Sequence, residues 1–436
     1  MTSRHHLTLS ADEIAALQHV VRTGSTTQAR RAQIILLTGE EMPQVTIAAE
    51  IGLSERQVRR WQRAFEAQRL GIFPALAAAD EAQDETPALA GPTDEQPKQD
   101  QGVVVVPALP GIDEPRRALL LRKKPGVEPG DPMAEAGRKI LHFHFERMLL
   151  HEPGSRLGED IEALHDMRVA TRRMRSALDV FGSFYQDKAL RAIRRGLRDA
   201  GRALGSVRDM DVFIEKLGHY QETLPEAASL DPLIEVCIAR RDAARQKLIV
   251  HLDSAEFEQF VTTFEAFLTT PGAGAKPIDR AQPSPYQVRH IVPRFVYTRY
   301  EAVRAYEPIL DQASIETLHA LRIDFKRLRY TLEFFAEVLG PEGITVIEDV
   351  KALQDHLGDL NDAEVAGHFL REFVTHYEES QTGVLLRERR SIEGVVQYLA
   401  HQYAAKHRLV TTFPQAWAYF NRDEMRRNLA LAVSTL

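Results

Sequence analysis

The chain contains a single cysteine, two tryptophans and no long apolar run. One cysteine, Cys237, excludes an intrachain disulfide and a cysteine-based zinc cluster. The amino terminus lacks the apolar segment of a secretory signal peptide, and no run approaches the length of about 20 residues that a membrane helix needs. We therefore expect a soluble protein of a reducing, cytoplasmic compartment.

Excess positive charge is also lacking, because 55 lysines and arginines stand against 62 acidic residues and give a net charge of −7. This balance argues against a basic nucleic-acid coat protein but allows a local cationic channel on an acidic body. An apolar content of 44% is sufficient for a sizeable core, and the length of 436 residues predicts two or three domains. The sequence contains no βαβ alternation and no glycine-rich phosphate loop. We expect an all-α protein.

Residues 1–74 have the pattern of a small helical domain. Three capping boxes mark helix starts, formed by the pairs Ser10/Glu13, Ser25/Gln28 and Ser54/Gln57. The helix predicted from Glu55 to about Arg69 places Val58, Trp61 and Phe65 on one stripe. A second stripe is polar and cationic, as in a helix that reads DNA, and we list as DNA-binding candidates Arg56, Gln57, Arg59, Arg60 and Arg63.

The segments 47–54 and 58–61 resemble the homeodomain-like helix-turn-helix modules at the start of insertion-sequence transposases. This resemblance covers some 60 residues and implies binding of double-stranded DNA. The alternative is a helical bundle that only packs on a neighbour and keeps its arginines in solvent. Transposition is not implied, because the sequence shows no Asp-Asp-Glu catalytic domain.

Residues 75–132 are predicted to form an acidic, Pro/Ala-rich flexible linker, because their composition cannot bury enough apolar surface to offset the entropy of ordering. Within it, Val103–Val106 is a short apolar run, interpreted as a sticky spot or a docking strand. The cationic stretch from Arg116 to Lys124 is interpreted as a solvated patch, with a polyanion-catching arm as the alternative.

A pattern of one histidine and four cations occurs twice in the remaining chain. Cations follow His165 and His319 at the same spacings, and the two sets are Arg168, Arg172, Arg173 and Arg175, and Arg322, Lys326, Arg327 and Arg329. On a helix the histidine and three of its cations lie within about 80° of arc. Such a row of positive charge suits a long polyanion better than a single carboxylate.

The duplication extends to Leu204–Asp209, which is matched by Leu357–Asp362 at nearly the same separation as the histidines. A period this long predicts a duplicated half-domain rather than a solenoid repeat. We place the domain at 133–436, with halves at about 133–270 and 284–420 and a Gly/Pro-rich seam between them.

A second cationic stripe follows the first motif, and its members are Arg191, Arg194, Arg195, Arg198 and Arg202. These arginines lie within about 100° of arc and repel one another unless an anion is bound. At the repeat separation Arg198 corresponds to Lys351, but Arg202 and Arg208 correspond to Asp355 and Asn361. The first half is therefore expected to contribute more charge.

These repeated segments resemble the CHAD family, the conserved histidine α-helical domain, over roughly residues 133–420. The resemblance implies two pseudo-symmetric four-helix bundles with a basic groove or pore between them. It also implies binding of inorganic polyphosphate and association with polyphosphate granules. The expected polyphosphate contacts are His165, Arg168, Arg172, Arg173, Arg175, Arg191, Arg194, Arg195, Arg198, Arg202, Arg208, His319, Arg322, Lys326, Arg327, Arg329 and Lys351.

Arginine is suited to this task because its planar fork grips two phosphate oxygens and cannot be deprotonated. The two motif histidines either contact the anion or anchor helix packing, and the sequence leaves both open. Asp209 and Asp362 are expected to cap helices or to orient arginines. We expect no cofactor, no metal and no catalytic residue, because the only Glu-x-Glu pair, Glu256 and Glu258, lies in a helical region and no β-barrel is predicted.

Two functions follow from this organisation. The first is a non-enzymatic polyphosphate-binding protein whose amino-terminal domain links polyphosphate granules to DNA in the nucleoid. The alternative is a DNA-binding transcriptional regulator whose carboxy-terminal domain senses polyphosphate or a phosphorylated ligand. A regulator requires sequence-specific DNA affinity, whereas a link requires only non-specific affinity.

Overall fold

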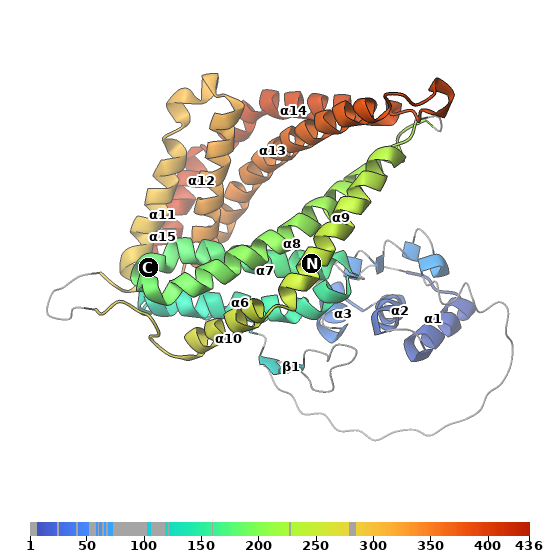
Figure 1. The fold of residues 1–436 in the computed structure, drawn as a ribbon. Helices are drawn as coiled ribbons and strands as arrows, with labels where there is room; N and C mark the ends of the chain where they lie inside the picture. Colours follow the sequence, from blue (N-terminus) through green and yellow to red (C-terminus); the bar gives the residue numbers. More distant parts are fainter. Residues whose placement is uncertain are drawn as a thin grey trace, which may run out of the picture. The chain divides into compact units, whose positions relative to one another are not determined.

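The computed structural model describes residues 7–23, 26–40, 42–51, 58–59, 61–62, 65–66, 69–72, 103–105, 118–120, 122–158, 160–225, 228–278 and 285–436 (Figure 1). Helices dominate these residues, and two strands of three residues each make up the only sheet within them. The all-α prediction is confirmed. The chain divides into two compact units, Met1–Lys98 and Gln99–Leu436, which we describe separately.

The first unit begins with a helix whose start the sequence predicts. Ser10 N–H donates to Glu13 Oε2 at 2.9 Å, and Glu13 N–H donates to Ser10 Oγ at 3.2 Å. This reciprocal capping box satisfies two of the free amides at the start of a helix. The two other predicted boxes, at Ser25 and Ser54, lie outside the described residues. The helical elements of this unit are α1 (Ala11–Thr23), α2 (Thr26–Gly39), α3 (Gln44–Ile51) and the 3₁₀ turn η1 (Arg69–Ile72).

The predicted apolar stripe of the first unit forms its core. Val58 and Phe65 are fully buried, and Trp61 packs against the same cluster. Beside them, Gln44 Nε2 donates to Gln62 Oε1 at 2.7 Å, and Gln62 Nε2 donates to Thr38 Oγ1 at 2.9 Å. This buried polar chain joins α2, α3 and the helical residues around Gln62, and a satisfied network of this kind fixes one packing arrangement.

The second unit consists of long helices connected by short turns. Its first half contains α6 (Met133–Leu157), α7 (Ile161–Phe181), η3 (Gly182–Phe184), α8 (Asp187–Gln221), α9 (Asp231–Leu252) and α10 (Ala255–Thr269). Its second half contains α11 (Val288–Arg304), η4 (Glu307–Gln312), α12 (Ile315–Phe334), α13 (Glu342–Ser380), η5 (Leu386–Glu388), α14 (Glu393–Phe420) and α15 (Asp423–Ser434).

Both histidine motifs lie on helices with a side-chain N-cap. Asp160 accepts a hydrogen bond from Glu162 N–H at 2.9 Å at the start of α7. Ser314 accepts from Thr317 N–H at 3.2 Å at the start of α12. These caps fix where each motif helix begins and therefore which side chains face the neighbouring helices.

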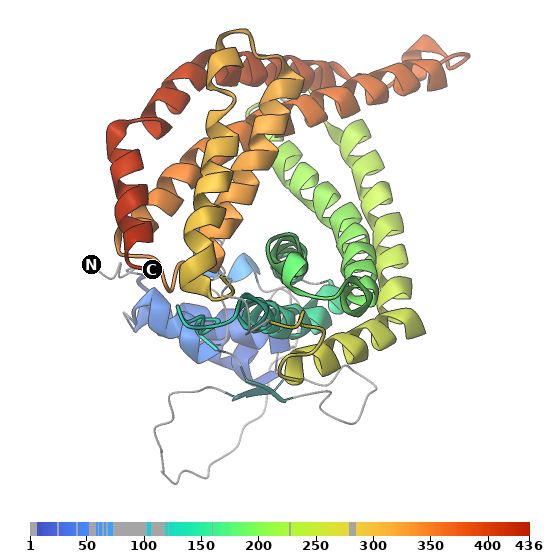
Figure 2. The same ribbon diagram turned by 90° about the vertical axis from the view of Figure 1, so that its left-hand side faces the viewer.

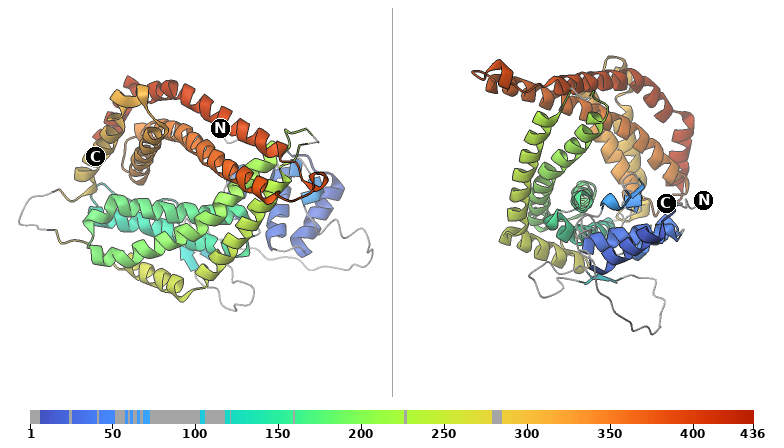
Figure 3. Two further views of the ribbon diagram at one scale, coloured as in Figure 1. Left: turned by 45° about the horizontal axis from the view of Figure 1, so that its top comes forward. Right: turned by 90° about the vertical axis from the view of Figure 1, so that its right-hand side faces the viewer.

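Two hydrophobic clusters hold the second unit together. The larger one takes residues from both halves, and the Phe181 ring at the end of α7 lies 5.4 Å from Phe335. The smaller one lies where the far ends of α8 and α9 meet α13 and α14, and it includes Leu217, Cys237 and Leu370. Figures 2 and 3 show these two long helix pairs converging from different directions.

The carboxy-terminal helix α15 extends the second half beyond its predicted end at residue 420. Met425, Leu429 and Val433 of α15 are buried in the larger cluster. Gly340 N–H also donates to Ala432 C=O at 2.9 Å, which ties the start of α13 to α15.

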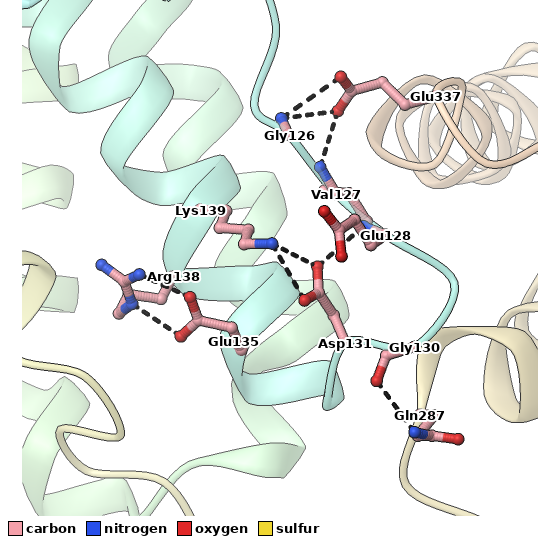
Figure 4. Close-up of polar contacts among 10 residues, drawn as sticks. All are labelled: Gly126, Val127, Glu128, Gly130, Asp131, Glu135, Arg138, Lys139, Gln287 and Glu337. Carbon is pink, nitrogen blue, oxygen red and sulfur yellow. Dashed lines mark hydrogen bonds and ion pairs between the residues drawn. The ribbon is translucent and has the colours of Figure 1, made fainter.

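The structure differs from the predicted flexible linker at several places between residues 103 and 132. Strand β1 (Val103–Val105) pairs antiparallel with β2 (Ala118–Leu120), so the valine run is a strand that pairs within its own chain. Farther on, Val127 is buried, and Glu337 accepts hydrogen bonds from Val127 N–H and Gly126 N–H, each at 3.0 Å (Figure 4). Composition does not reveal these contacts because their partner, Glu337, is more than 200 residues away in sequence.

The matching segments of the predicted repeat occupy similar positions. His165 and His319 lie on α7 and α12, and the segments Leu204–Asp209 and Leu357–Asp362 lie within α8 and α13. Each half therefore has a motif helix followed by a long helix. The duplication and its pseudo-two-fold axis stay predictions.

Candidate polyanion-binding site

The two motif helices contact each other and bring their cations together. Lys326 of α12 has Arg168, Arg172 and Arg175 of α7 and Arg322 of its own helix as its principal charged neighbours. We call these five residues the cationic cluster. The sequence predicts all five as phosphate contacts.

The positive charge of the cationic cluster is poorly compensated. Among the described residues, only Arg168 of the five has an acidic partner, Asp209, at 2.9 Å. Arg172 Nε is shielded from solvent and makes no hydrogen bond within this part of the chain. A buried donor without a partner costs free energy, so the folded chain does not compensate this group within its described residues.

The positive charges of the cluster also act on the ammonium group of Lys326. Burial, followed by the charges of Arg172, Arg322, Arg175 and Arg168, lowers the pKa of Lys326 to about 8. Both causes disfavour the charged ammonium, and an anion placed among these groups restores it.

Tyr330 and Glu333 form one wall of the site beside the cationic cluster. Tyr330 is buried, and its ring centre lies 5.7 Å from Arg173, 5.4 Å from Arg329 and 5.9 Å from Lys326 Nζ. Glu333 forms ion pairs with Arg173 of α7 at 2.8 Å and with Arg329 of α12 at 3.3 Å. This carboxylate therefore joins the two halves and neutralises two cations next to the cluster.

Three further predicted contacts have acidic partners. Arg173 and Arg329 face Glu333, and Arg327 pairs with Asp324 of its own helix at 2.8 Å. Acidic side chains of the protein partly neutralise these three arginines, so they contribute less uncompensated positive charge than the cluster does.

Arg208, a further predicted contact, is buried on α8. The residue is 4% exposed and lies 3.8 Å from Glu162, although Nε and Nη1 find no hydrogen-bond partner among the described residues. Its charge acts on Arg168 of the cationic cluster. Arg208 is therefore a buried cation near the cluster, and its role as a phosphate contact stays a prediction.

The arginine stripe of α8 lies beside the cationic cluster. The side chains of Arg175 and Arg168 lie against α8 at Gly201 and Gly205, which come about one helical turn after Arg198 and Arg202 in the sequence. Arg194 pairs with Asp187 at 3.7 Å, whereas the exposed members have no ion pair within the described residues, namely Arg191, Arg195, Arg198 and Arg202. Lys351, on α13, is also exposed.

The motif histidines and aspartates have defined surroundings. His319 is exposed, and its Nδ1 hydrogen-bonds Asn361 Oδ1 at 2.9 Å, which anchors α12 to α13. His165 is partly exposed on α7. Asp209 and Asp362 lie inside helices and pair with Arg168 at 2.9 Å and Lys216 at 3.1 Å, so they orient cations and do not cap helices.

Tyr330 and Glu333 are the site residues that the sequence pattern missed. Tyr330 directly follows the second motif, and an aromatic ring among cations is a signal for a cation–π wall. Glu333 gives a weaker signal, because its spacing from Arg329 predicts an ordinary pair within one helix. Its pairing with Arg173 depends on how α7 and α12 meet.

The first unit presents one of the predicted DNA contacts. Arg59 is exposed next to the buried Val58, as expected for the polar face of that helix. The side chains of Arg56, Gln57, Arg60 and Arg63 lie outside the described residues. Arg31 stacks 3.9 Å over the Trp61 ring and places a further cation beside this helix.

The described part of the chain contains no group of three or more histidines, cysteines and acidic residues placed to hold a metal ion. No helix in it combines the length and apolar character required to cross a membrane.

Comparison with curated proteins finds two uncharacterized proteins of Mycobacterium tuberculosis, from strains CDC 1551 / Oshkosh and ATCC 25618 / H37Rv. Each is 24% identical over 252 residues, which is 56% of this chain and 47% of the relative. The match thus spans about half the length of these relatives.

Among solved structures, the CHAD domain from the plant Ricinus communis matches 72% of this chain and 96% of its own, with 23% identity and a TM-score of 0.48. PptA from Streptomyces chartreusis matches 66% of this chain and 99% of its own, with 15% identity and a TM-score of 0.48.

Two family models match the chain. The homeodomain-like domain model covers residues 25–71, within the first unit. The CHAD domain model covers residues 139–371, more than half of the chain, and includes both motif helices and the whole cationic cluster. The chain therefore belongs to the CHAD domain family and has a homeodomain-like helix-turn-helix region before that domain.

Proposed function

We propose that the second unit binds inorganic polyphosphate through the cationic cluster and the neighbouring arginines of α8, without catalysing a reaction. The observation that supports this function best is the set of cations around Lys326. Four arginines from two helices face one lysine, and only Arg168 has a carboxylate partner among the described residues.

A linear polyanion is the ligand class that fits this arrangement. Arg168 and Arg175 of the cationic cluster lie against α8, the helix that carries the arginine stripe, so cations stand on α7, α12 and α8 rather than on one helix alone. Each phosphate group of the polymer meets a planar guanidinium fork, and release of its counterions drives binding.

The test measures polyphosphate binding by the full chain and by matched double variants. Arg172→Gln with Arg322→Gln removes two cluster charges that have no acidic partner in the described residues. The control, Arg387→Gln with Arg389→Gln, removes two exposed charges around η5. We expect the cluster variant to lose at least about tenfold in affinity at low salt and the control to change less than about twofold. Equal affinities in the two variants would remove the cluster from the binding site.

We further propose that the helix-turn-helix region binds double-stranded DNA, so that one chain links polyphosphate granules to DNA in the cytoplasm. Support comes from the homeodomain-like match and from the exposed Arg59 beside a buried Val58 and Phe65. In the full chain, Arg59→Ala is expected to weaken DNA binding and leave polyphosphate binding unchanged. Arg22→Ala, at an exposed position of α1, is the control.

The alternative, a transcriptional regulator that senses polyphosphate, predicts a different DNA profile. A regulator protects a defined site at concentrations at which random DNA stays free, whereas a link binds both alike. A footprint of the full chain on genomic fragments, with and without polyphosphate, separates these functions.

A further inference from the structure

We propose that Lys326 is a nucleophilic amine that accepts acyl groups from acyl phosphates, and that its acylation turns the cationic cluster off. The regulatory half of this inference rests on the proposed polyphosphate binding. The reactivity of the amine stands on the geometry of the site.

Lys326 is placed unlike a typical surface lysine. Its side chain is partly buried, it forms no ion pair with the described residues, and its Nζ lies 5.9 Å from the centre of the Tyr330 ring. The charged groups around it are Arg168, Arg172 and Arg175 on α7 and Arg322 on α12. Asp209 is directed to Arg168 and Glu333 to Arg173 and Arg329, so neither carboxylate is paired with the amine.

This environment supplies both requirements of an acyl acceptor. Burial and the neighbouring arginines lower the pKa of Lys326 to about 8, so a sizeable fraction of the amine is neutral near pH 7.5. The same arginines offer donors to the phosphate of an acyl phosphate and so concentrate this reagent beside the amine. The bound phosphate offsets the arginine charges, but burial, the first cause of the lowered pKa of Lys326, still favours the neutral amine.

The reaction balances without a further reagent. The lone pair of Lys326 Nζ attacks the acyl carbonyl carbon and forms a C–N bond. The bond from that carbon to the phosphate oxygen then breaks, inorganic phosphate leaves, and one proton passes from nitrogen to solvent. The product amide is neutral and larger than the amine, so it removes a charge and occupies space within the cluster.

The first arm of the test measures where acetyl groups attach. The full chain is treated with acetyl phosphate near pH 7.5, and the rate at each lysine is followed by peptide mass spectrometry. Lys247, an exposed residue of α9, is the internal reference. We expect Lys326 to react about tenfold faster than Lys247, with a rate that rises through pH 8.

The second arm compares donors. An uncharged acetyl ester replaces acetyl phosphate, and the preference for Lys326 over Lys247 is expected to fall at least threefold because the arginines no longer hold the donor. Inorganic tripolyphosphate is expected to slow reaction of Lys326 with acetyl phosphate and not that of Lys247. A rate at Lys326 no higher than at Lys247, or one indifferent to tripolyphosphate, overturns the proposal.

The third arm tests the consequence with Lys326→Arg, which keeps the charge and cannot be acylated in this way. Each chain is compared with itself before and after treatment with acetyl phosphate, whatever affinity Lys326→Arg has at the start. The unsubstituted chain is expected to lose polyphosphate affinity on treatment, and Lys326→Arg to keep its own starting value. Equal losses show that acylation elsewhere is responsible and overturn the regulatory role. If neither chain binds polyphosphate before treatment, the proposed function fails, while the first two arms still decide whether the amine is reactive.

Discussion

The charged form of Lys326 destabilises the folded chain, an effect that the sequence alone does not reveal. Its pKa falls from 10.5 to about 8 on folding, so between these values unfolding takes up a proton. Lysine charge therefore destabilises the ligand-free fold most below pH 8, and this penalty disappears as the pH rises toward 10.5.

The prediction is that Lys326→Met raises the melting temperature at pH 7 and low salt, and that this gain shrinks steadily from pH 8 to 10.5. Thermal unfolding of both chains across this pH range measures it. Lys247→Met, on the exposed face of α9, is the control and is expected to give no such pH-dependent difference. A gain that is the same at pH 7 and pH 10 would mean that packing, not charge, is responsible.

Single residues also show where sequence reasoning succeeds and where it fails. Arg172 on α7 and Arg322 and Lys326 on α12 can be placed from helical periodicity, because each of these two helices has one continuous cationic face. The burial of Arg208 could not be predicted, because it depends on the packing of α8 around Leu204 and Val207 and on Glu162 of another helix. No local pattern encodes that long-range partner.

At the scale of elements, Glu333 is the connection between the motif helices. It balances Arg173 of α7 and Arg329 of α12, and its side chain is 16% exposed. Removing it frees two cations beside the cluster and leaves them without their shared partner.

We predict that Glu333→Gln lowers the free energy of unfolding by about 2 kcal/mol and increases polyphosphate affinity. Added polyphosphate should recover part of the lost stability, because it replaces the missing negative charge. The comparison variant Asp324→Asn weakens one ion pair, with Arg327 of the same helix, keeps an oxygen that can accept from Tyr306 Oη, and is expected to cost less. Unfolding in denaturant with and without polyphosphate provides the measurement, and a loss that polyphosphate does not reduce would contradict this account.

Two of the four glycines in the long helix α8 have opposite roles. At Gly196 an added methyl group would overlap the Phe260 ring of α10, whereas at Gly218 it would meet nothing within 4 Å. We predict that Gly196→Ala destabilises the domain by about 1–3 kcal/mol through overpacking. Gly218→Ala should stabilise it by about 0.5–1 kcal/mol, since alanine favours the helix. Equal changes in the free energy of unfolding for the two variants would show that α10 can shift to accommodate the added methyl group without loss of stability.

Elements show a similar limit of prediction. The starts of α1 and α7 and the buried face of the helix around Val58 follow from local signals such as a capping residue and a repeating apolar position. The segment 122–132 is ordered by Glu337 and Gln287, which are distant in sequence, and its composition resembles that of a linker.

For the whole molecule, salt dependence gives the clearest signature of the proposed function. If the five cations of the cluster each neutralise one phosphate, the logarithm of affinity should fall with the logarithm of salt concentration with a slope of about −3 to −4. Titrations of the full chain from low to physiological salt measure it. The Arg172→Gln and Arg322→Gln variant should lose about one to two from this slope, while a slope near zero would exclude an electrostatic groove.

The buried position of Cys237 makes its thiol a reporter of local opening. This only thiol of the chain is completely buried where the ends of α8 and α9 meet α13 and α14, and burial raises its pKa to about 11. A thiol reagent can reach the sulfur only while these helix ends are apart. The labelling rate therefore reports how often and for how long the junction between the two halves is open. Because no second cysteine contributes background, the unmodified protein can report how often its halves separate, and how far a bound polyanion slows that event.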